Sequence, residues 1–433
     1  MAAIPVLRLV AGALAACMLM TACGGDDGSS TADDGTGDDS RPAGAGVVKA
    51  DLARVNAPAD APVDQVVTGL RDFAVRMASS EGGGKNLVIS PTSIAVAFAM
   101  AEAGADDATA ADIAEVFGFP DQSAVHQAMN ALTAQLDAAN HEGNAQGSEG
   151  VTLELANAVW GQDGLTIGKE FLATLATEYG AGVDTVDFAD DPEGARAAIN
   201  GWVSDVTRER IPDLLSEPLD PATVVALVNA IYLKASWQTQ FSEDSTSDKP
   251  FDLTPSSTIN VPTMHESMLT TTASTGGGYS AVRLPYDGNE LSMVVVMPDA
   301  GTLADFESSM TGDRLAQIVD GLEPAAVDLS LPRFEAGSAL DLKGPLSALG
   351  LDIPGGDLSG IAPGTEIGAA VHAANITVDE KGTEAAAATA IMGLTSAPGE
   401  ITTIRIDRPF LFLIQHEATG APLFYGRITD PRG

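Results

Sequence analysis

The chain has 433 residues, of which 45% are apolar and 19% charged, so it can bury a core and is not disordered as a whole. Its 60 Asp and Glu against 22 Lys and Arg give a formal net charge of −38. Because Lys and Arg neutralise phosphates in nucleic-acid complexes, this charge excludes nucleic-acid binding and adhesion to membranes through basic residues. The two cysteines, Cys17 and Cys23, both lie near the amino terminus, which excludes a cysteine-based zinc site and a disulfide framework.

The first 22 residues are typical of a secretion signal. An apolar run of 14 residues, Leu9–Ala22, follows Arg8 and is too short to span a bilayer. The run leads into Leu-Met-Thr-Ala-Cys at residues 19–23, which resembles a bacterial lipobox. That resemblance implies a signal peptide over residues 1–22, a lipid on Cys23, and secretion to the outer face of a bacterial membrane. The alternative is an ordinary signal peptide that happens to contain a cysteine.

Residues 23–63 are predicted to form a flexible acidic tether. They begin with a stretch rich in Gly, Ser, Thr and Asp that has no aromatic residue, a composition typical of solvated linkers. From residue 64 to residue 431 no linker rich in Pro and Gly interrupts the sequence. We therefore expect one large folded domain over residues 64–431, with the membrane reached only through the lipid.

Within this domain, helical patterns come first and strand patterns later. Helical spacing of apolar residues occurs, in chain order, over residues 66–77, 91–104, 113–117, 125–136, 171–179 and from Pro192 to 206. Strands are predicted over 151–160, 183–188, 282–284, 291–297, 327–331, 403–406 and 410–414. The apolar run 223–233 is typical of a strand buried on both faces. Because helices and strands do not alternate regularly, the pattern indicates an α+β fold.

The sequence offers no catalytic site. None of the five His belongs to an HExxH motif, and there is no nucleophile elbow, P-loop or dinucleotide-binding motif. Carboxylate pairs such as Asp106-Asp107 are best explained as solvated helix caps in so acidic a chain. We therefore predict no enzyme, no bound metal and no cofactor.

The most unusual segment is 378–398, which contains four consecutive alanines. A helix is the simplest interpretation of the alanines, but Thr389, Gly393 and Thr395 are poor helix formers and no amphipathic stripe is present. With a period of two, one face contains only small or apolar uncharged residues: Thr383, Ala385, Ala387, Thr389, Ile391 and Gly393. The segment could therefore be either an exposed loop or a central strand.

This segment resembles the hinge and reactive-centre loop of serpins, a family of protease inhibitors. Other landmarks of the family follow in the same order along residues 64–431: Asn86-Leu87-Val88-Ile89-Ser90-Pro91-Thr92-Ser93-Ile94, Val228-Asn229-Ala230-Ile231-Tyr232-Leu233-Lys234, Leu331-Pro332-Arg333-Phe334, Arg408-Pro409-Phe410 and Leu423-Phe424-Tyr425-Gly426-Arg427. The resemblance implies a fold of three β-sheets and eight or nine helices with an exposed reactive-centre loop. The resemblance also implies that the protein is a monomer.

The resemblance also implies a function, the inhibition of serine-type endopeptidases by a suicide-substrate mechanism. A protease cuts the loop and forms an acyl-enzyme, the loop inserts into the main sheet as a new strand, and the displaced protease is distorted. Cysteine proteases are a minor possibility. The alternative is a non-inhibitory serpin that acts as a protease substrate or a binding module. Such members tend to carry bulky, charged or Pro residues in the hinge, which this chain does not.

The family's roles can be assigned to positions of this chain. The hinge would comprise Glu380, Gly382, Thr383, Glu384, Ala385, Ala386, Ala387, Ala388 and Thr389, with Gly382 as the pivot and Thr383 as the first side chain to insert. The region where the sheet opens would contain Ser90, Ser93, Asn229 and His372, with Trp237 at the top of the sheet. Lys381 replaces an acid that is common in the family at this position.

The reactive bond is expected at Ser396–Ala397. Counting Glu380 as the first position, Ser396 is the seventeenth, where inhibitory members usually have the residue before the cut. A small residue there favours an elastase-like or subtilisin-like protease. A trypsin-like protease is not favoured, because the sequence has no Lys or Arg between Lys381 and Arg405. Cutting after Met392 or Leu394 instead would indicate a chymotrypsin-like target. Counting back from Pro409 points nearer Pro398, because the loop is about two residues longer than is usual in the family.

Overall fold

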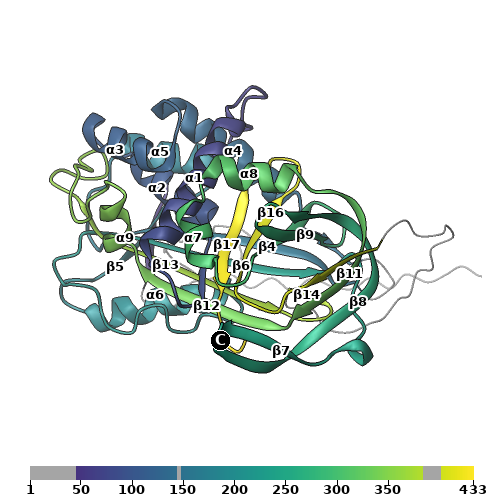
Figure 1. The fold of residues 1–433 in the computed structure, drawn as a ribbon. Helices are drawn as coiled ribbons and strands as arrows, with labels where there is room; N and C mark the ends of the chain where they lie inside the picture. The colour runs from purple at the N-terminus through teal and green to yellow at the C-terminus, as the bar shows by residue number, and fades with distance from the viewer. Residues whose placement is uncertain (1–44, 144–147, 384–400) are drawn as a thin grey trace, which may run out of the picture. The chain divides into compact units, whose positions relative to one another are not determined.

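The computed structural model describes residues 45–143, 148–383 and 401–433 (Figure 1). This part of the chain contains nine α-helices: α1 (Val63–Ser80), α2 (Pro91–Glu102), α3 (Asp107–Phe117), α4 (Gln122–Asp137), α5 (Lys169–Thr174), α6 (Pro192–Val206), α7 (Leu303–Ser308), α8 (Gly312–Asp320) and α9 (Lys343–Ala348). The first six correspond to the helices that periodicity predicts, although α2 ends two residues before the predicted 104. The predicted helix 171–179 begins as α5 and continues as a π-helix, η1 (Leu175–Tyr179).

The first sheet has β6 at its centre. Its strands run in the order β1 (Gly46–Val48), β5 (Val183–Val186), β4 (Gly150–Gln162), β6 (Val225–Ser236), β14 (Gly382–Thr383), β13 (Ile367–Val378) and β12 (Phe334–Asp341), with β3 (His141–Glu142) paired to β4. The strand predicted over 151–160 is β4, and that over 183–188 is β5, which ends two residues earlier. β14 contains the hinge residues Gly382 and Thr383, so part of the predicted hinge already belongs to this sheet.

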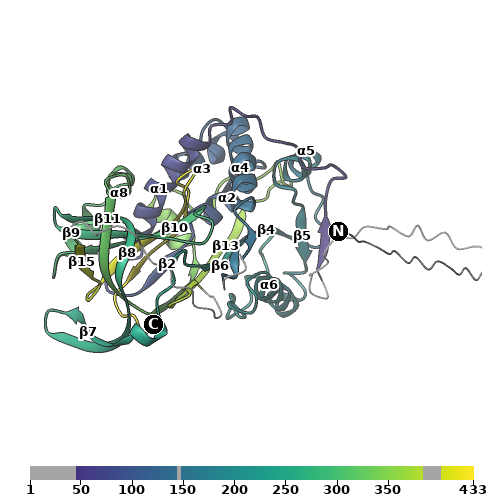
Figure 2. The same ribbon diagram turned by 90° about the vertical axis from the view of Figure 1, so that its right-hand side faces the viewer.

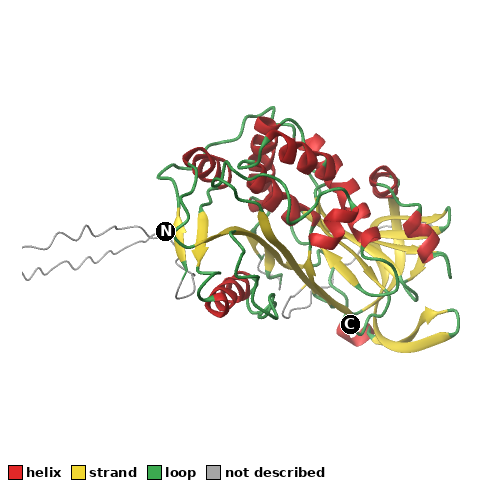
Figure 3. Ribbon diagram, turned by 90° about the vertical axis from the view of Figure 1, so that its left-hand side faces the viewer, coloured by secondary structure: helices red, strands yellow, loops and turns green. Residues whose placement is uncertain are grey.

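Helices cover both faces of this sheet, α2 on one side and α6 on the other (Figure 2). On β6, Leu227 and Ile231 belong to the large core that includes α2, whereas Val228 and Ala230 pack in a second core with α6. This alternation confirms the prediction that the apolar run 223–233 is buried on both faces. Most of the helices gather on the α2 side of the strands (Figure 3).

The second sheet is built around the long strand β8. Its order is β15 (Ile401–Arg405), β11 (Glu323–Pro332), β8 (Ser257–Gly276), β9 (Tyr279–Pro285), β10 (Leu291–Pro298), β16 (Phe410–His416), β17 (Pro422–Ile428) and β2 (Leu87–Ile89), with β7 (Ser247–Thr254) paired to β8. The short 3-10 helix η2 (Glu243–Ser245) precedes β7. Because the 20-residue β8 pairs with β7, β11 and β9 in turn, the expected second and third sheets are joined into one hydrogen-bonded network.

Helix α2 is buried on every side. All its residues from Pro91 to Glu102 are buried, and it packs against β4, β6 and β17. Ser90 caps its first turn, since the Ser93 amide donates to the Ser90 hydroxyl at 3.2 Å, and Pro91 occupies the first helical position. The Ser-Pro pair in the sequence therefore marks the start of this helix as predicted.

The folded body begins earlier in the chain than residue 64. Gly46–Val48 pair with β5 at the edge of the first sheet, and the chain then crosses η1 and α4 before α1 starts. The part of the predicted flexible tether from residue 45 to residue 63 therefore belongs to the folded body. Its Ala-rich composition concealed a strand held by backbone hydrogen bonds rather than by large side chains. Within the described ranges, no helix has the length and apolarity needed to cross a membrane.

Candidate functional site

The site lies where β6 and β13 separate at one end of the first sheet. Over most of their length the two strands pair directly and in parallel, from Val225 with Ile367 to Ile231 with Ala374. Beyond these pairs β14 lies between them, antiparallel to both, with Thr383 opposite Ala235 and Val378. The sheet is therefore closed along most of β6 and already holds the first two residues of a strand that could continue between β6 and β13. We call this end the hinge end.

Gly382 makes this approach possible. Its φ is +153°, and a Cβ on it would lie 2.0 Å from the carbonyl oxygen of Ala235. Only glycine fits at such a contact, which supports the role of pivot. Thr383 follows with its side chain 1% exposed and its hydroxyl 2.7 Å from the hydroxyl of Tyr286. The expected first side chain to insert is thus already buried before any cleavage.

Trp237 closes the hinge end over β14. Its ring stacks on Tyr286 with 4.5 Å between ring centroids, its backbone amide donates to Lys381, and its indole N–H donates to the carbonyl of Asp379. Burial raises the pKa of Tyr286, so its hydroxyl stays protonated and can share a hydrogen bond with Thr383. The structure therefore places Trp237 at the hinge end of the first sheet, in direct contact with the hinge.

Glu380 fixes the residues before the pivot. Its side chain is 4% exposed, and one carboxylate oxygen accepts hydrogen bonds from Arg333 Nε at 2.8 Å and Nη2 at 2.6 Å and from the Thr246 hydroxyl. Burial acts to raise the pKa of Glu380, but the bonds from Arg333 and Thr246 outweigh it and lower the pKa overall. Lys381, the departure from the family pattern, lies 3.5 Å from Glu243.

A second, fully buried polar cluster lies under the directly paired part of β6 and β13. The Ser90 amide donates to His372 Nε2 at 3.0 Å, while the other ring nitrogen lies 2.5 Å from Asn229 Oδ1. The Ser93 hydroxyl donates to the Ala230 carbonyl at 3.2 Å. The structure thus brings together four of the residues named for the opening region, and Trp237 lies apart from them at the hinge end.

His372 is a neutral core residue in this cluster. Because Nε2 accepts from an amide, the proton must be on Nδ1, from which it is donated to Asn229. Burial lowers the pKa of His372 to about 3, so the ring remains neutral over the physiological range. The cluster therefore joins the start of α2 to β6 and β13 through neutral hydrogen bonds, which can exchange partners without moving charge.

Some of the predicted site residues lie outside the described part of the chain, and some residues of the observed site were not predicted from the sequence. Cys23, the hinge residues Glu384–Thr389 and the predicted reactive bond Ser396–Ala397 lie outside the described residues. The sequence did not predict three residues of the site. Asn157 accepts a hydrogen bond from the Ser93 hydroxyl at 3.1 Å, Tyr286 contacts Thr383, and Arg333 binds Glu380. Arg333 stands within a quoted family motif, which was a usable signal, whereas nothing in the sequence distinguishes Asn157.

Comparison with known proteins gives one consistent match. A family model described as "Serpin (serine protease inhibitor)" matches residues 69–431. Proteins named leukocyte elastase inhibitor from Sus scrofa and Homo sapiens are 35% and 34% identical, and in both cases the alignment covers 80% of this chain and 93% of the relative.

Solved structures show the same fold. A crystal structure of human glycosylated kallistatin has 28% identity and a TM-score of 0.75, with 86% of this chain and 99% of that chain covered. Human thyroxine-binding globulin complexed with thyroxine has 27% identity and a TM-score of 0.76, covering 86% and 100%. The thermophilic protein tengpin in its native state, at 24% identity and a TM-score of 0.77, covering 88% and 97%, supports the fold alone.

Proposed function

Because the chain belongs to the serpin family, we propose that it inhibits serine-type endopeptidases by trapping them on its reactive loop. One observation carries the proposal: β14 is the start of a strand between β6 and β13, formed by the hinge residues Gly382 and Thr383, and the small residues 385–389 follow after Glu384. After cleavage, the same register would bring Ala385 and Ala387 onto the buried face already occupied by Thr383. None of these side chains would obstruct insertion.

Insertion exchanges one hydrogen-bonded ladder for two. The seven registered pairs that join β6 directly to β13 would separate, and the new strand would pair with both neighbours. Ten or so added residues could contribute on the order of ten net hydrogen bonds, each worth about 1 kcal/mol. Because globular proteins are stable by only about 5–15 kcal/mol, this gain is large enough to distort an attached protease. The uncleaved form is then stable kinetically, behind the barrier of opening the sheet.

The expected target is an elastase-like or subtilisin-like protease, with a chymotrypsin-like one as the alternative. Ser396 is too small to fill a deep specificity pocket, and the relatives named leukocyte elastase inhibitor point in the same direction. Cleavage two or four residues earlier, after Leu394 or Met392, would shorten the inserted strand and reduce the force on the protease. We therefore favour the bond Ser396–Ala397.

The test is to mix the protein with pancreatic elastase, subtilisin and chymotrypsin and to follow covalent complexes. A band resistant to SDS at the summed mass, with loss of protease activity, is expected with elastase or subtilisin. Mass spectrometry of the released carboxy-terminal fragment identifies the bond: a fragment starting at Ala397 supports the assignment, whereas a start at Gly393 or Thr395 moves the target to the chymotrypsin-like class. A cleaved chain with fully active protease would indicate the non-inhibitory alternative.

The matched variant for this experiment is Ala387→Arg. Thr383→Arg is unsuitable, since Thr383 is already buried against Tyr286 and the substitution would disturb the uncleaved protein. An Arg at 387 would meet the buried face only during insertion, where an unpaired guanidinium costs several kcal/mol, roughly 2–7 for a polar group. The variant should still be cut but should release active protease. Inhibition equal to wild type would contradict the insertion mechanism.

We further propose that the protein is secreted and held on the outer face of a bacterial membrane by a lipid on Cys23. The support is the Leu-Met-Thr-Ala-Cys sequence at the end of the apolar signal. Cys23→Ser should abolish incorporation of labelled fatty acid and shift the protein out of the detergent-soluble membrane fraction or leave its signal uncut. Cys17→Ser is the matched control and should change neither property. If Cys23→Ser incorporated as much labelled fatty acid as wild type, the result would contradict the proposed lipid on Cys23.

A further inference from the structure

Glu102 is a carboxyl group that the proposed inhibitory mechanism does not use. It is the last residue of α2 and the only charged side chain on that helix. It is 1% exposed, and within the described part of the chain its Oε2 has no hydrogen-bond partner. Its position at a helix carboxyl terminus, where the backbone dipole disfavours negative charge, makes ionisation still less favourable.

Glu102 acts electrostatically on Tyr179 of η1. From α4, His126 is buried, and its Nδ1 lies 2.8 Å from the hydroxyl of Tyr179 on η1. Burial lowers the pKa of His126 to about 4, which keeps it neutral. Burial, then Glu102 and then Glu178 raise the pKa of Tyr179, so it too is uncharged.

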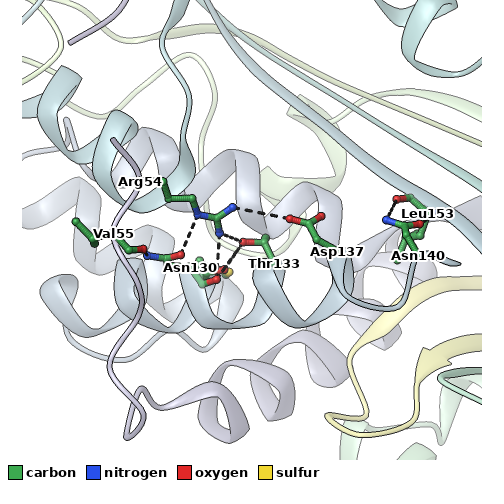
Figure 4. Close-up of polar contacts among 8 residues, drawn as sticks. Arg54, Val55, Asn130, Thr133, Asp137, Asn140 and Leu153 are labelled. Carbon is green, nitrogen blue, oxygen red and sulfur yellow. Dashed lines mark hydrogen bonds and ion pairs between the residues drawn. The ribbon is translucent and has the colours of Figure 1, made fainter. Parts of the chain in front are cut away.

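Arg54 is the cation that acts on this cluster, and it is engaged elsewhere. Its guanidinium donates to the Asn130 side chain at 2.9 Å and to the Thr133 hydroxyl at 2.5 Å, and lies 3.9 Å from Asp137 (Figure 4). Glu178 accepts from Asn130 at 3.0 Å. A carboxylate at Glu102 would therefore be buried near the neutral Tyr179, and the Arg54 guanidinium that acts on Tyr179 is bonded to α4 instead.

Burial raises the pKa of Glu102 to about 8, so the carboxyl holds its proton at neutral pH. Because this pKa exceeds the ordinary value of 4.5, the stabilisation linked to the proton is fully present below pH 4.5. It is lost as the pH rises through about 8. Above that pH the folded protein contains an unpaired charge in its helical layer.

We propose that Glu102 is a proton-linked switch that sets how readily β6 and β13 separate in the uncleaved protein. When the proton passes to solvent, the carboxylate favours arrangements in which α2 loosens from α4 and η1 and water reaches it. The other end of α2 carries Ser90 and Ser93, which bond to His372 on β13 and to the Ala230 carbonyl on β6. Loosening α2 therefore lowers the barrier to separating β6 from β13 and lets the loop insert without cleavage. The inference rests on the insertion step of the proposed function.

The experiment measures the rate of spontaneous conversion of uncleaved protein at pH 6.5 to 9.5 and constant ionic strength. Converted protein is recognised as an intact chain, by mass, that has become heat-resistant, so the readout needs no protease. For wild type, we expect the rate to rise roughly fivefold between pH 7 and pH 9, which corresponds to a pKa lower by about one unit in the opened state. Glu102→Gln should convert at a rate independent of pH.

Glu178→Gln is the matched control, because Glu178 belongs to the same cluster but is paired with Asn130. It should keep the wild-type dependence on pH. A parallel rise in wild type and Glu102→Gln, or a wild-type rate unchanged from pH 7 to pH 9, would overturn the proposal. The carbon-13 signal of the Glu102 carboxyl gives a second measurement on unsubstituted protein, and titration near 4.5 instead of 8 would also overturn it.

The two proposals fail in different ways. If the protein forms no covalent complex with any protease at pH 7 but still converts faster at high pH, the proposal for Glu102 is supported and the proposed inhibition is contradicted. If covalent complexes form and the rate of conversion does not depend on pH, the proposed inhibition is supported and the proposal for Glu102 is contradicted.

Discussion

At the scale of single residues, the hinge depends on a buried carboxylate held by an exposed cation. Glu380 is almost fully buried, whereas the Arg333 side chain that binds it is 44% exposed. The desolvation cost therefore falls mainly on the acid, and the two hydrogen bonds from the guanidinium offset it. Removing Arg333 would leave Glu380 buried with Thr246 as its remaining side-chain donor.

We predict that Arg333→Gln lowers the free energy of unfolding of the uncleaved protein by about 1–3 kcal/mol at pH 7, measured by urea denaturation. Because the pKa of Glu380 is lowered, its contribution is present above the ordinary value of 4.5 and is lost as the pH falls through the lower folded value. The difference between wild type and variant should therefore vanish in acid. Lys381→Gln, whose partner Glu243 is exposed, should change the free energy by less than about 1 kcal/mol. A pH-independent difference would refute this assignment.

The residues of the site differ in how far the sequence could reveal them. Ser90 is recognisable because a Ser-Pro pair before an apolar run marks a helix start, and Gly382 because it stands at the pivot position of the hinge that the segment resembles. Asn157 could not be found, since its role depends on lying opposite Asn229 in the pairing of β4 with β6. That register is a contact between distant parts of the chain, which local patterns do not contain.

At the scale of elements, the segment from Gly46 to Val55 clamps the edge of the first sheet to the helices. β1 pairs with β5, Lys49 donates to the Gly180 carbonyl, and the Val55 amide donates to Thr177 in η1. Arg54 completes the clamp on α4 (Figure 4). The segment therefore links the β5 side of the sheet to α4 and η1.

We predict that Arg54→Ala destabilises the uncleaved protein by about 1–3 kcal/mol, because Asn130 and Thr133 lose a charged donor. Arg208→Ala is the control: Arg208 bonds Glu154 at 2.6 Å, but its side chain is 56% exposed, so its loss should cost under about 1 kcal/mol. Urea denaturation of both variants measures the difference. Equal effects would mean that the clamp adds nothing beyond a surface ion pair.

Elements rich in large apolar residues were predictable and polar ones were not. The strands β6, β10 and β16 consist mostly of apolar residues, so their burial is evident from the sequence. The hairpin of β7 and β8 was missed because Ser, Thr and Asp occupy much of it and many of its side chains are exposed. Its stability comes from backbone pairing, which depends weakly on side-chain type.

At the scale of the whole molecule, the proposed mechanism requires a more stable fold after cleavage. Because the loop would add a central strand, we predict that protein cut in the loop unfolds roughly 10–15 °C above the uncleaved form, the shift that about 10 kcal/mol produces in a chain of this size. Circular dichroism during heating measures it. Cleavage of Ala387→Arg should raise the unfolding temperature much less than cleavage of wild type. If cleavage left the unfolding temperature of wild type unchanged, the result would be inconsistent with insertion.

The position of β1 also restricts where a captured protease can fit. If insertion continues the register of Thr383 with Ala235, ten further residues bring Gly393 level with Val225. Val225 lies opposite Gly161, Gly161 opposite Thr185, and Thr185 opposite Gly46. The end of the inserted strand would thus be level with the start of the folded chain and four strand spacings away, about 19 Å. A protease carried to the end of that strand would therefore lie close to Gly46, at the pole where the described part of the chain begins.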